Sequence, residues 1–268
     1  MDDPPEAEFV PAARPHAVAR LRTACLAQDE TRPRLDRGAP RKPRCDACRL
    51  PPTHCACALR PRVPTHAGVC LLMAGFEALK PSNTGWLVAD VVPDTHAFAW
   101  SRTAVEPALL ALLDDAAWRP LVVFPGEFAA PERVVTELPA APASDARRPL
   151  FILLDGTWAE ARKAFRKSPF LARLPVLSLD PARLSRYRLR SAWHDHHLCT
   201  AEIAALCLAM AGDVLAARTL EAWLDVFSER YLRAKQSVPA DESDDAHRAL
   251  AQLRAAASGA PRPAHIGR

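Results

Sequence analysis

Residues 150–167 read LFILLDGTWAEARKAFRK, in which a short apolar run leads into an aspartate, a glycine and then an amphipathic helical pattern. The apolar run predicts a buried strand that ends at Asp155. Thr157 and Glu160 have the spacing of a capping box, which predicts that a helix begins beside them. Because Gly156 has no Cβ, the chain can bend tightly between the two elements. The stretch therefore predicts a strand–turn–helix unit with a carboxylate at its turn.

Four other short apolar runs alternate with helical patterns along the chain. They are GVCLLM (68–73), HAFAW (96–100), LVVF (121–124) and PVLSL (175–179). Helical patterns lie at 84–92 and 107–117, and two more apolar helical stripes follow residue 200. This alternation predicts an α/β fold, with a mostly parallel sheet flanked by helices on both faces. In such sheets ligands bind at the carboxyl ends of the strands, where Asp155 is expected.

The rest of the chain divides by composition. Residues 1–40 are polar and proline-rich, and we expect a partly disordered extension with one short helix near 16–27. Residues 41–62 hold a cysteine cluster, and residues 63–235 hold the α/β pattern. Residues 236–268 contain the acidic run DESDD (241–245) and then become rich in alanine, arginine and proline, so we expect a disordered tail.

Neither a membrane segment nor a secretory signal is visible in the sequence. No stretch approaches about eighteen uninterrupted apolar residues, and the N-terminus is acidic and proline-rich. We therefore expect a cytoplasmic protein without membrane contact, whose eight cysteines are thiols or metal ligands rather than disulfides. GxGxxG, Walker A, HExxH and GxSxG motifs are also missing, which disfavours dinucleotide-binding, P-loop, zinc-protease and serine-hydrolase functions.

Four of the cysteines fall close together with a spacing typical of a metal site. They are Cys45, Cys48, Cys55 and Cys57, in the pattern C-x2-C-x6-C-x-C. Two close pairs of thiolates suit a closed tetrahedral Zn²⁺ site, which would be structural because no coordination position stays open. His54 could replace one ligand, although four cysteines suffice, and unrelated free cysteines are the alternative. Neighbouring arginines, among them Arg44 and Arg49, are typical of small zinc modules that contact nucleic-acid phosphates.

Positive charge is concentrated in one stretch of an almost neutral chain. The net charge is only +4, yet residues 158–190 contain nine Lys and Arg against two Asp and Glu. Such a stripe is typical of a surface that binds a polyanion, and a solvated helix face is the alternative.

Five motifs in this order resemble the DTW-domain family, which is named after its Asp-x-Thr-Trp turn. They are the cysteine cluster with Pro51, PSNTG (81–85), Asp155-x-Thr157-Trp158, YRLR (187–190) and HLCTAE (197–202). The resemblance is strongest to the bacterial tRNA-uridine aminocarboxypropyltransferases. It implies transfer of the 3-amino-3-carboxypropyl group of S-adenosylmethionine to N3 of a uridine in the tRNA variable loop. It also implies a SPOUT-like fold, in which a knotted C-terminal part binds the donor.

The resemblance further implies which residues bind the donor and the RNA. Donor-binding residues are expected in three loops: Phe124, Pro125 and Gly126; Leu154 and Gly156; and Leu198, Cys199, Thr200 and Glu202. Arg188 or Arg190 would hold the donor carboxylate through two parallel hydrogen bonds. Contacts to tRNA phosphates, which make affinity sensitive to salt, are expected from a basic and polar set. This set comprises Arg44, Arg49, Asn83, Arg162, Lys163, Arg166 and Lys167.

The expected catalytic residues are Asp155, Thr157 and Trp158. Asp155 could assist removal of the proton from uridine N3, and holding its loop in place is the alternative role. Thr157 would bind the donor and Trp158 would form a wall of its pocket. Taken alone, the turn is equally compatible with an ordinary connection that buries a tryptophan.

Two other functions are compatible with the same features. A SPOUT-type RNA methyltransferase would use the same donor but transfer its methyl group. A non-catalytic, zinc-dependent RNA-binding protein would use the turn only as a structural element. In each case we expect RNA as the partner and a monomer as the favoured state.

Overall fold

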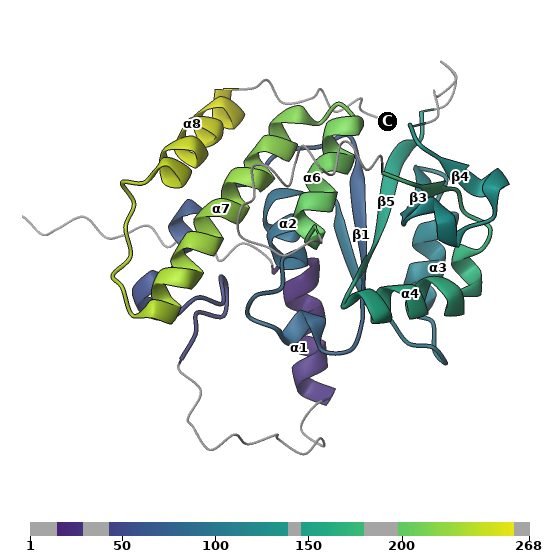
Figure 1. Cartoon of the computed structure of the whole chain (residues 1–268), viewed down its shortest axis with the longest axis horizontal. Coiled ribbons are helices and arrows are strands. Elements are labelled where there is room, and N and C mark those ends of the chain that lie inside the picture. Colours follow the sequence, from purple (N-terminus) through teal and green to yellow (C-terminus); the bar gives the residue numbers. More distant parts are fainter. Residues whose placement is uncertain (1–14, 29–42, 139–145, 180–197, 260–268) are drawn as a thin grey trace, which may run out of the picture.

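The computed structural model describes residues 15–28, 43–138, 146–179 and 198–259 (Figure 1). Within them, six parallel strands form one sheet in the order β2-β1-β5-β3-β6-β4. The strands are β1 (Gly68–Met73), β2 (Thr95–Ala99), β3 (Trp118–Val123), β4 (Val134–Val135), β5 (Arg148–Asp155) and β6 (Val176–Leu177). The predicted α/β fold with a mostly parallel sheet is confirmed.

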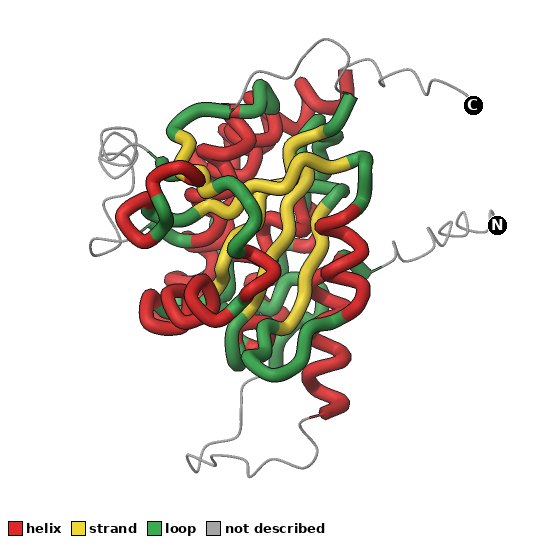
Figure 2. The backbone as a smooth tube through the Cα atoms, turned by 90° about the vertical axis from the view of Figure 1, so that its right-hand side faces the viewer, coloured by secondary structure: helices red, strands yellow, loops and turns green. Residues whose placement is uncertain are grey.

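Helices cover both faces of this sheet. One face carries α1 (Ala17–Gln28), α2 (Gly85–Val91), α6 (Thr200–Met210) and α7 (Val214–Gln236), and the other carries α3 (Pro107–Asp114) and α4 (Trp158–Lys167). A last helix, α8 (Asp245–Gly259), packs on the outside of α7. Figure 2 shows the twisted strands between the two helical layers.

The central strands explain the two-layered core. All six residues of β1 are buried. Because side chains alternate between the faces of a sheet, Leu71 joins the apolar cluster of α2, α6 and α7, while Leu72 joins that of α3 and α4. Each fully buried leucine contributes about 1.5–3 kcal/mol relative to an exposed one. Continuous burial of this kind is typical of parallel strands that are covered on both faces.

The strand register brings several loops to one edge of the sheet. Met73 pairs with Asp155, while Val123 pairs with Leu153 on one side and with Leu177 on the other. The parallel strands β1, β5, β3 and β6 therefore all end at this edge. Since α4 begins directly after β5, its first turn lies there too.

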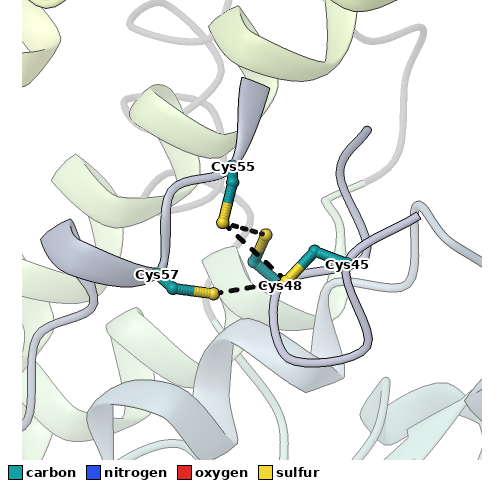
Figure 3. A group of neighbouring side chains, drawn as sticks. All are labelled: Cys45, Cys48, Cys55 and Cys57. Atoms are coloured by element: carbon teal, nitrogen blue, oxygen red, sulfur yellow. Dashed lines mark hydrogen bonds between the residues drawn. The ribbon is translucent and has the colours of Figure 1, made fainter. Parts of the chain in front are cut away.

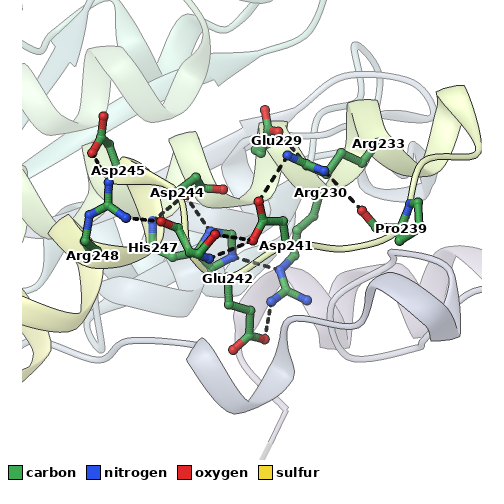
Figure 4. A network of polar contacts seen from close by, with 11 residues as sticks. Glu229, Arg230, Arg233, Pro239, Asp241, Glu242, Asp244, Asp245, His247 and Arg248 are labelled. Atoms are coloured by element: carbon green, nitrogen blue, oxygen red, sulfur yellow. Dashed lines mark hydrogen bonds and ion pairs between the residues drawn. The ribbon is translucent and has the colours of Figure 1, made fainter.

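The C-terminal segment corrects one prediction. The sequence predicts a disordered tail over 236–268, but residues 245–259 form α8. His247 and Leu250 are buried, and Arg230 of α7 donates a hydrogen bond to His247 Nε2 at 3.1 Å within the polar network of Figure 4. The prediction of disorder is wrong here because a helix whose apolar residues are mostly alanine can still bury its few large side chains against a long neighbour.

The remaining predictions about the course of the chain have different outcomes. The short helix expected near 16–27 is confirmed as α1. Residues 180–197, between β6 and α6, lie outside the described residues, so the knot expected for the C-terminal part stays a prediction, as do the domain boundaries. Among the described residues, no helix has both the length and the apolar character needed to cross a bilayer.

Candidate active site

Asp155 lies at the end of β5, where it joins three elements. Its side chain is buried. Asn83, just before α2, donates from Nδ2 to Asp155 Oδ2 at 2.7 Å, and Thr200, the first residue of α6, donates from Oγ1 to Asp155 Oδ1 at 2.5 Å. Both carboxylate oxygens are therefore engaged, and Asp155 holds the starts of α2 and α6 against β5. We refer to Asn83, Asp155 and Thr200 as the polar hub.

The space around the polar hub is small enough to require a glycine. A Cβ on Gly85 would lie 2.8 Å from Asp155 Oδ2 and 3.3 Å from Asn83 Oδ1. Asn83 Oδ1 also accepts a hydrogen bond from the backbone N–H of Trp86 at 3.0 Å, which satisfies one of the free donors at the start of α2. The segment PSNTG thus lets α2 begin in direct contact with the Asp155 carboxylate.

Burial dominates the electrostatics of Asp155. Removal from water raises the pKa of its carboxyl group, while the hydrogen bonds from Thr200 and Asn83 oppose that shift because they stabilise the ionised form. A carboxylate with two fixed donors and almost no access to solvent is suited to hold loops in place.

The turn after β5 forms the predicted capping box. The backbone N–H of Thr157 donates to Glu160 Oε2 at 2.9 Å, and the backbone N–H of Glu160 donates to Thr157 Oγ1 at 3.3 Å. The Thr157 hydroxyl also donates to Glu160 Oε2 at 2.7 Å, and this bond, together with the one from the Thr157 backbone N–H, lowers the pKa of Glu160. A Cβ on Gly156 would lie 3.0 Å from Ala74 Cβ, so the glycine permits close packing against the loop after β1. Thr157 therefore fixes the start of α4.

A cavity of about 520 Å³ opens at the carboxyl ends of β3, β5 and β6. It is lined by Val123, Phe124, Pro125, Gly126, Glu127, Leu153, Leu154, Gly156, Trp158, Ala161, Ser178, Leu179, Leu198, Thr200 and Ile203. Its volume lies within the range typical of pockets for small organic ligands. Because Thr200 belongs both to the cavity wall and to the polar hub, the hub sets the position of this wall.

One wall of the cavity is aromatic. Trp158 is 44% exposed and stacks on Phe124, with ring centroids 5.4 Å apart and planes inclined by 10°. Phe128 meets Trp158 edge to face at 5.7 Å. A large, flat and partly exposed ring beside an apolar cavity is suited to contact a planar ligand or a nucleobase.

Few polar groups face the cavity. Ser178 Oγ accepts a hydrogen bond from the backbone N–H of Gly126 at 3.0 Å, which joins the loop after β3 to β6. Glu127 is exposed, and among the described lining residues it is the one carboxylate. Neither Glu127 nor Ser178 was predicted, although the position of FPGE directly after a strand is the signal that could have indicated Glu127.

Most residues that the sequence predicts around the donor line this cavity. They are Phe124, Pro125, Gly126, Leu154, Gly156, Trp158, Leu198 and Thr200. Asp155 and Thr157 do not line it. Cys199 and Glu202 form the start of α6, where the backbone N–H of Cys199 donates to Glu202 Oε2 at 2.7 Å. Arg188 and Arg190 lie outside the described residues.

The residues predicted to contact RNA fall into two groups. Arg44 and the basic residues of α4 are exposed: Arg162, Lys163, Arg166 and Lys167. The Arg162 guanidinium lies 4.8 Å from the Phe128 ring centroid, so the basic face adjoins the aromatic wall. Arg49 and Asn83 are 2% and 5% exposed. The prediction that Arg49 and Asn83 contact RNA is wrong, because both side chains are buried within the protein, where Arg49 Nη1 and Asn83 Nδ2 donate to other residues of the chain.

The four predicted metal ligands come together from two short segments (Figure 3). Cys45 Sγ lies 3.5 Å from Cys57 Sγ and 3.8 Å from Cys55 Sγ, and Cys48 Sγ lies 3.7 Å from Cys55 Sγ. All four sulfur atoms lie within 4.8 Å of one another. Tetrahedral Zn–S bonds of about 2.3 Å place neighbouring sulfurs about 3.8 Å apart, so the cluster fits an ion of this kind.

His54 does not belong to this cluster. Its Nε2 lies 2.8 Å from the carbonyl oxygen of Val238, and its Nδ1 lies 2.9 Å from Thr53 Oγ1. Both ring nitrogens are thus engaged, and the contact to Val238 joins the cysteine segment to the end of α7. Among the described residues, the four cysteines are the group that could hold a metal ion, at the positions that the spacing predicts.

Comparisons with known proteins agree with these features. The DTW domain family matches residues 42–232 of this chain. The chain is 26% identical over 182 residues to tRNA-uridine aminocarboxypropyltransferase 2 of Macaca fascicularis, in a match that covers 64% of this chain and 57% of that protein. The chain thus spans little more than half the length of this curated relative. No solved structure matches the chain.

Proposed function

Because this chain belongs to the DTW domain family, we propose that it is a tRNA-uridine aminocarboxypropyltransferase that uses S-adenosylmethionine. The observation that carries the proposal is the cavity of about 520 Å³ beside the Asp-Gly-Thr-Trp turn at residues 155–158. That turn carries the Asp-x-Thr-Trp sequence typical of the family. The name of the curated relative supports the substrate and the group transferred, and both belong to the proposal.

The cavity offers complementary walls for the two ends of the donor. The stacked pair of Trp158 and Phe124 provides a flat surface for the adenine ring. Glu127 places a negative charge at the mouth, which would attract the cationic ammonium and sulfonium groups of the donor. The adenosine part therefore lies along the aromatic wall, and the amino-acid arm points toward the open side.

The orientation of the donor decides which group is transferred. When uridine N3 attacks Cγ of the amino-acid arm, an N–C bond forms while the Cγ–S bond breaks. The electron pair of the broken bond stays on sulfur, 5′-methylthioadenosine leaves, and the proton of N3 passes to solvent. Methyl transfer would require the methyl carbon to face the acceptor instead, so positioning within the cavity determines the product.

Asp155 contributes by positioning. Its two oxygens accept from Asn83 and Thr200, and its side chain is outside the cavity lining. Its carboxylate keeps Thr200, and hence one wall of the donor cavity, at a fixed distance from β5. Of the two roles that the sequence leaves open for Asp155, the proposal therefore adopts the positioning role.

The exposed basic face of α4 is the proposed contact for tRNA. Arg162, Lys163, Arg166 and Lys167 lie on a helix whose first residue, Trp158, lines the cavity. Phosphates bound along this face would bring the RNA backbone beside the cavity mouth. A base turned out of the loop could then stack on the aromatic wall and present its N3 to the donor.

Zinc is the ion proposed for the four cysteines. Four thiolates leave no open coordination position, so the ion would supply structural stability and no Lewis acidity. The cysteine segment contacts α7. An ion that stabilises this segment would therefore also stabilise the helical layer that contains α2, α6 and α7.

Labelled donor tests this function. The purified protein is incubated with unmodified tRNA and S-adenosylmethionine labelled in either the carboxyl carbon or the methyl carbon, and the nucleosides are then analysed by mass spectrometry. We expect the carboxyl label in tRNA and the mass of 3-(3-amino-3-carboxypropyl)uridine. Methyl label alone would identify a methyltransferase. RNA binding without donor binding in calorimetry would identify a non-catalytic RNA-binding protein.

A further inference from the structure

Arg49 has an unusual backbone conformation for its residue type. It follows the metal ligand Cys48 directly, and its φ is +66°, in the left-handed region that favours glycine. Its backbone N–H donates to the carbonyl oxygen of Cys45 at 2.7 Å, which closes the turn that carries the first two cysteines. A non-glycine residue in this conformation carries local backbone strain, which indicates that its side chain has a role.

The Arg49 side chain points into the protein and contacts the segment before α2. Its Nη1 donates to the carbonyl oxygen of Asn83 at 2.9 Å and to that of Lys80 at 3.3 Å. Its guanidinium lies 4.4 Å from the ring centroid of Trp86 and 5.2 Å from that of Phe227. The two rings fix the guanidinium in place, so the hydrogen bonds to residues 80–83 have a defined direction.

A second hydrogen bond returns from α2 to the cysteine turn. Trp86 Nε1 donates to the carbonyl oxygen of Ala47, between the first two metal ligands, at 3.2 Å. The cysteine turn therefore donates a hydrogen bond to the segment before α2, and α2 donates one back to the turn. A displacement of the turn would displace the backbone of Asn83.

Asn83 connects the cysteine turn to the cavity through hydrogen bonds of its backbone and its side chain. Its carbonyl oxygen is held by Arg49, and its side chain donates to Asp155, which in turn accepts from Thr200 of the cavity wall. Arg49, Asn83 and Asp155 are all buried. Water therefore has little access to replace these bonds, and the contacts form a continuous path from the cysteine cluster to the cavity.

We propose that Arg49 is a positioning residue that makes the geometry of the donor cavity depend on the metal-loaded cysteine cluster. The inference rests on the proposed function only where it names the ligand of the cavity. The cysteine segment then acts on catalysis through the polar hub. This role replaces the RNA contact that the sequence suggests for Arg49.

The test compares two buried arginines that both contact the cysteine segment. Arg49→Met keeps an apolar stem between Trp86 and Phe227 and removes the donors to Asn83. Arg230→Met is the matched control, because Arg230 is also buried and donates to the carbonyl oxygen of Cys55 at 2.9 Å. Within the described part of the chain, its other hydrogen-bond partners are His247 and Glu242, which lie outside the polar hub. Metal analysis must show one ion per chain in the wild type and in both variants.

Amide hydrogen exchange gives a readout that needs neither donor nor RNA. In Arg49→Met we expect exchange at residues 80–86 and 198–203 to be faster than in the wild type by about tenfold, because a hydrogen bond from a charged donor is lost. In Arg230→Met we expect faster exchange at residues 242–255 of the α8 region and unchanged exchange at 80–86. Equal exchange at 80–86 in the wild type and Arg49→Met would overturn the inference.

Calorimetric titration with S-adenosylmethionine is the second experiment. We expect Arg49→Met to weaken donor binding by about tenfold and Arg230→Met to leave it unchanged. Equal losses in the two variants would show a general loss of stability and would overturn the positioning role. If the wild type itself does not bind the donor, the proposed function fails, whereas the exchange experiment still decides whether Arg49 holds the hub.

Discussion

Asp155 and Asn83 form a hydrogen-bonded pair whose side chains can be exchanged between the two positions. Asp155→Asn places an amide where a carboxylate accepts two hydrogen bonds, so either Asn83 or Thr200 loses its acceptor. We expect the transfer rate of this variant to fall at least about tenfold. The double variant Asp155→Asn with Asn83→Asp again pairs one donor with one acceptor. We therefore expect it to recover most of the activity, measured as labelled donor transferred to tRNA.

The single variant Asn83→Asp is the control for this exchange. It places two carboxylates in contact within a buried site, so we expect an inactive protein in which one of the two carboxyl groups stays protonated. Recovery in the double variant requires that Asp155 acts by holding the polar hub. An inactive double variant with a native hydrogen-exchange pattern would show that a carboxylate is needed at position 155 for the chemistry.

The burial of Asp155 predicts how stability changes with pH. Since burial raises its pKa, the folded protein binds more protons at this site than the unfolded chain in the interval between the two pKa values. The stability that this group contributes is fully present below the unfolded pKa and is lost as the pH rises through the folded pKa. As the pH rises above about 4, the free energy of unfolding of the wild type should therefore fall relative to that of Asp155→Asn, until the pH has passed the folded pKa. Denaturant titrations of both proteins measure this difference, and a difference that stays constant would contradict the prediction.

The position of Asp155 can be predicted from the sequence, but its partners cannot. The strand end and the capping box are local patterns, so they are visible in residues 150–160. Asn83 and Thr200 lie 72 and 45 positions away along the chain, and the fold brings them to Asp155. Arg49 shows a similar limit. A basic residue beside metal ligands is typical of a phosphate contact, and its packing between Trp86 and Phe227 becomes visible only in the structure.

Among the elements, α4 combines a cavity wall with the basic face. Its first residue lines the cavity, and its outer face carries the exposed Arg166 and Lys167 in the last turn. If these two side chains contact phosphates, Arg166→Gln with Lys167→Gln should weaken tRNA binding and reduce the slope of log affinity against log salt by about 2. Binding titrations at several salt concentrations measure both effects.

Arg248→Gln is the control for the α4 variant. Arg248 is an exposed arginine of α8, a helix that lies on the opposite side of the molecule from α4 (Figure 1). Its replacement lowers the net charge by one, half the change in the α4 double variant, and leaves α4 unchanged. An equal loss of affinity per charge in both variants would show that tRNA responds to overall charge and would remove α4 from the interface.

The elements also differ in how well the sequence predicts them. Long apolar runs such as 68–73 and 150–154 predict β1 and β5 closely, because continuous burial imposes the same pattern at every position. β6 lies within the predicted run 175–179 but has only two residues. β4 also has only two residues, too few to show a period. α8 is missed because its stability comes from contacts with α7, among them the bond from Arg230 to His247, which no local pattern in residues 236–259 shows.

At the scale of the whole molecule, the cysteine segment joins parts of the chain that are far apart in the sequence. Arg230 of α7 donates to the carbonyl oxygen of Cys55 at 2.9 Å, and Arg254 of α8 donates to that of Ala58 at 3.1 Å. Arg49 connects the same segment to the start of α2. All of these contacts lie on the face of the sheet that carries α2 and α7, whereas α3 and α4 cover the other face.

Metal removal should therefore destabilise the two faces of the molecule unequally. Replacement of Cys55 and Cys57 by serine removes two of the proposed ligands, so we expect loss of the bound ion. The free energy of unfolding should fall by several kcal/mol, on the order of half the free energy with which a zinc-finger peptide binds Zn²⁺. Hydrogen exchange should become faster in α2, α7 and α8 and change little in α4. Cys70→Ala is the matched control, since it removes a buried thiol from the core under α3 and α4 and leaves the ligand set intact. We expect it to keep one ion per chain and to speed exchange on the α3 and α4 face. A serine variant that keeps its ion, or exchange that rises equally on both faces, would contradict the view that the cysteine segment stabilises one side of the sheet and, through that side, the cavity.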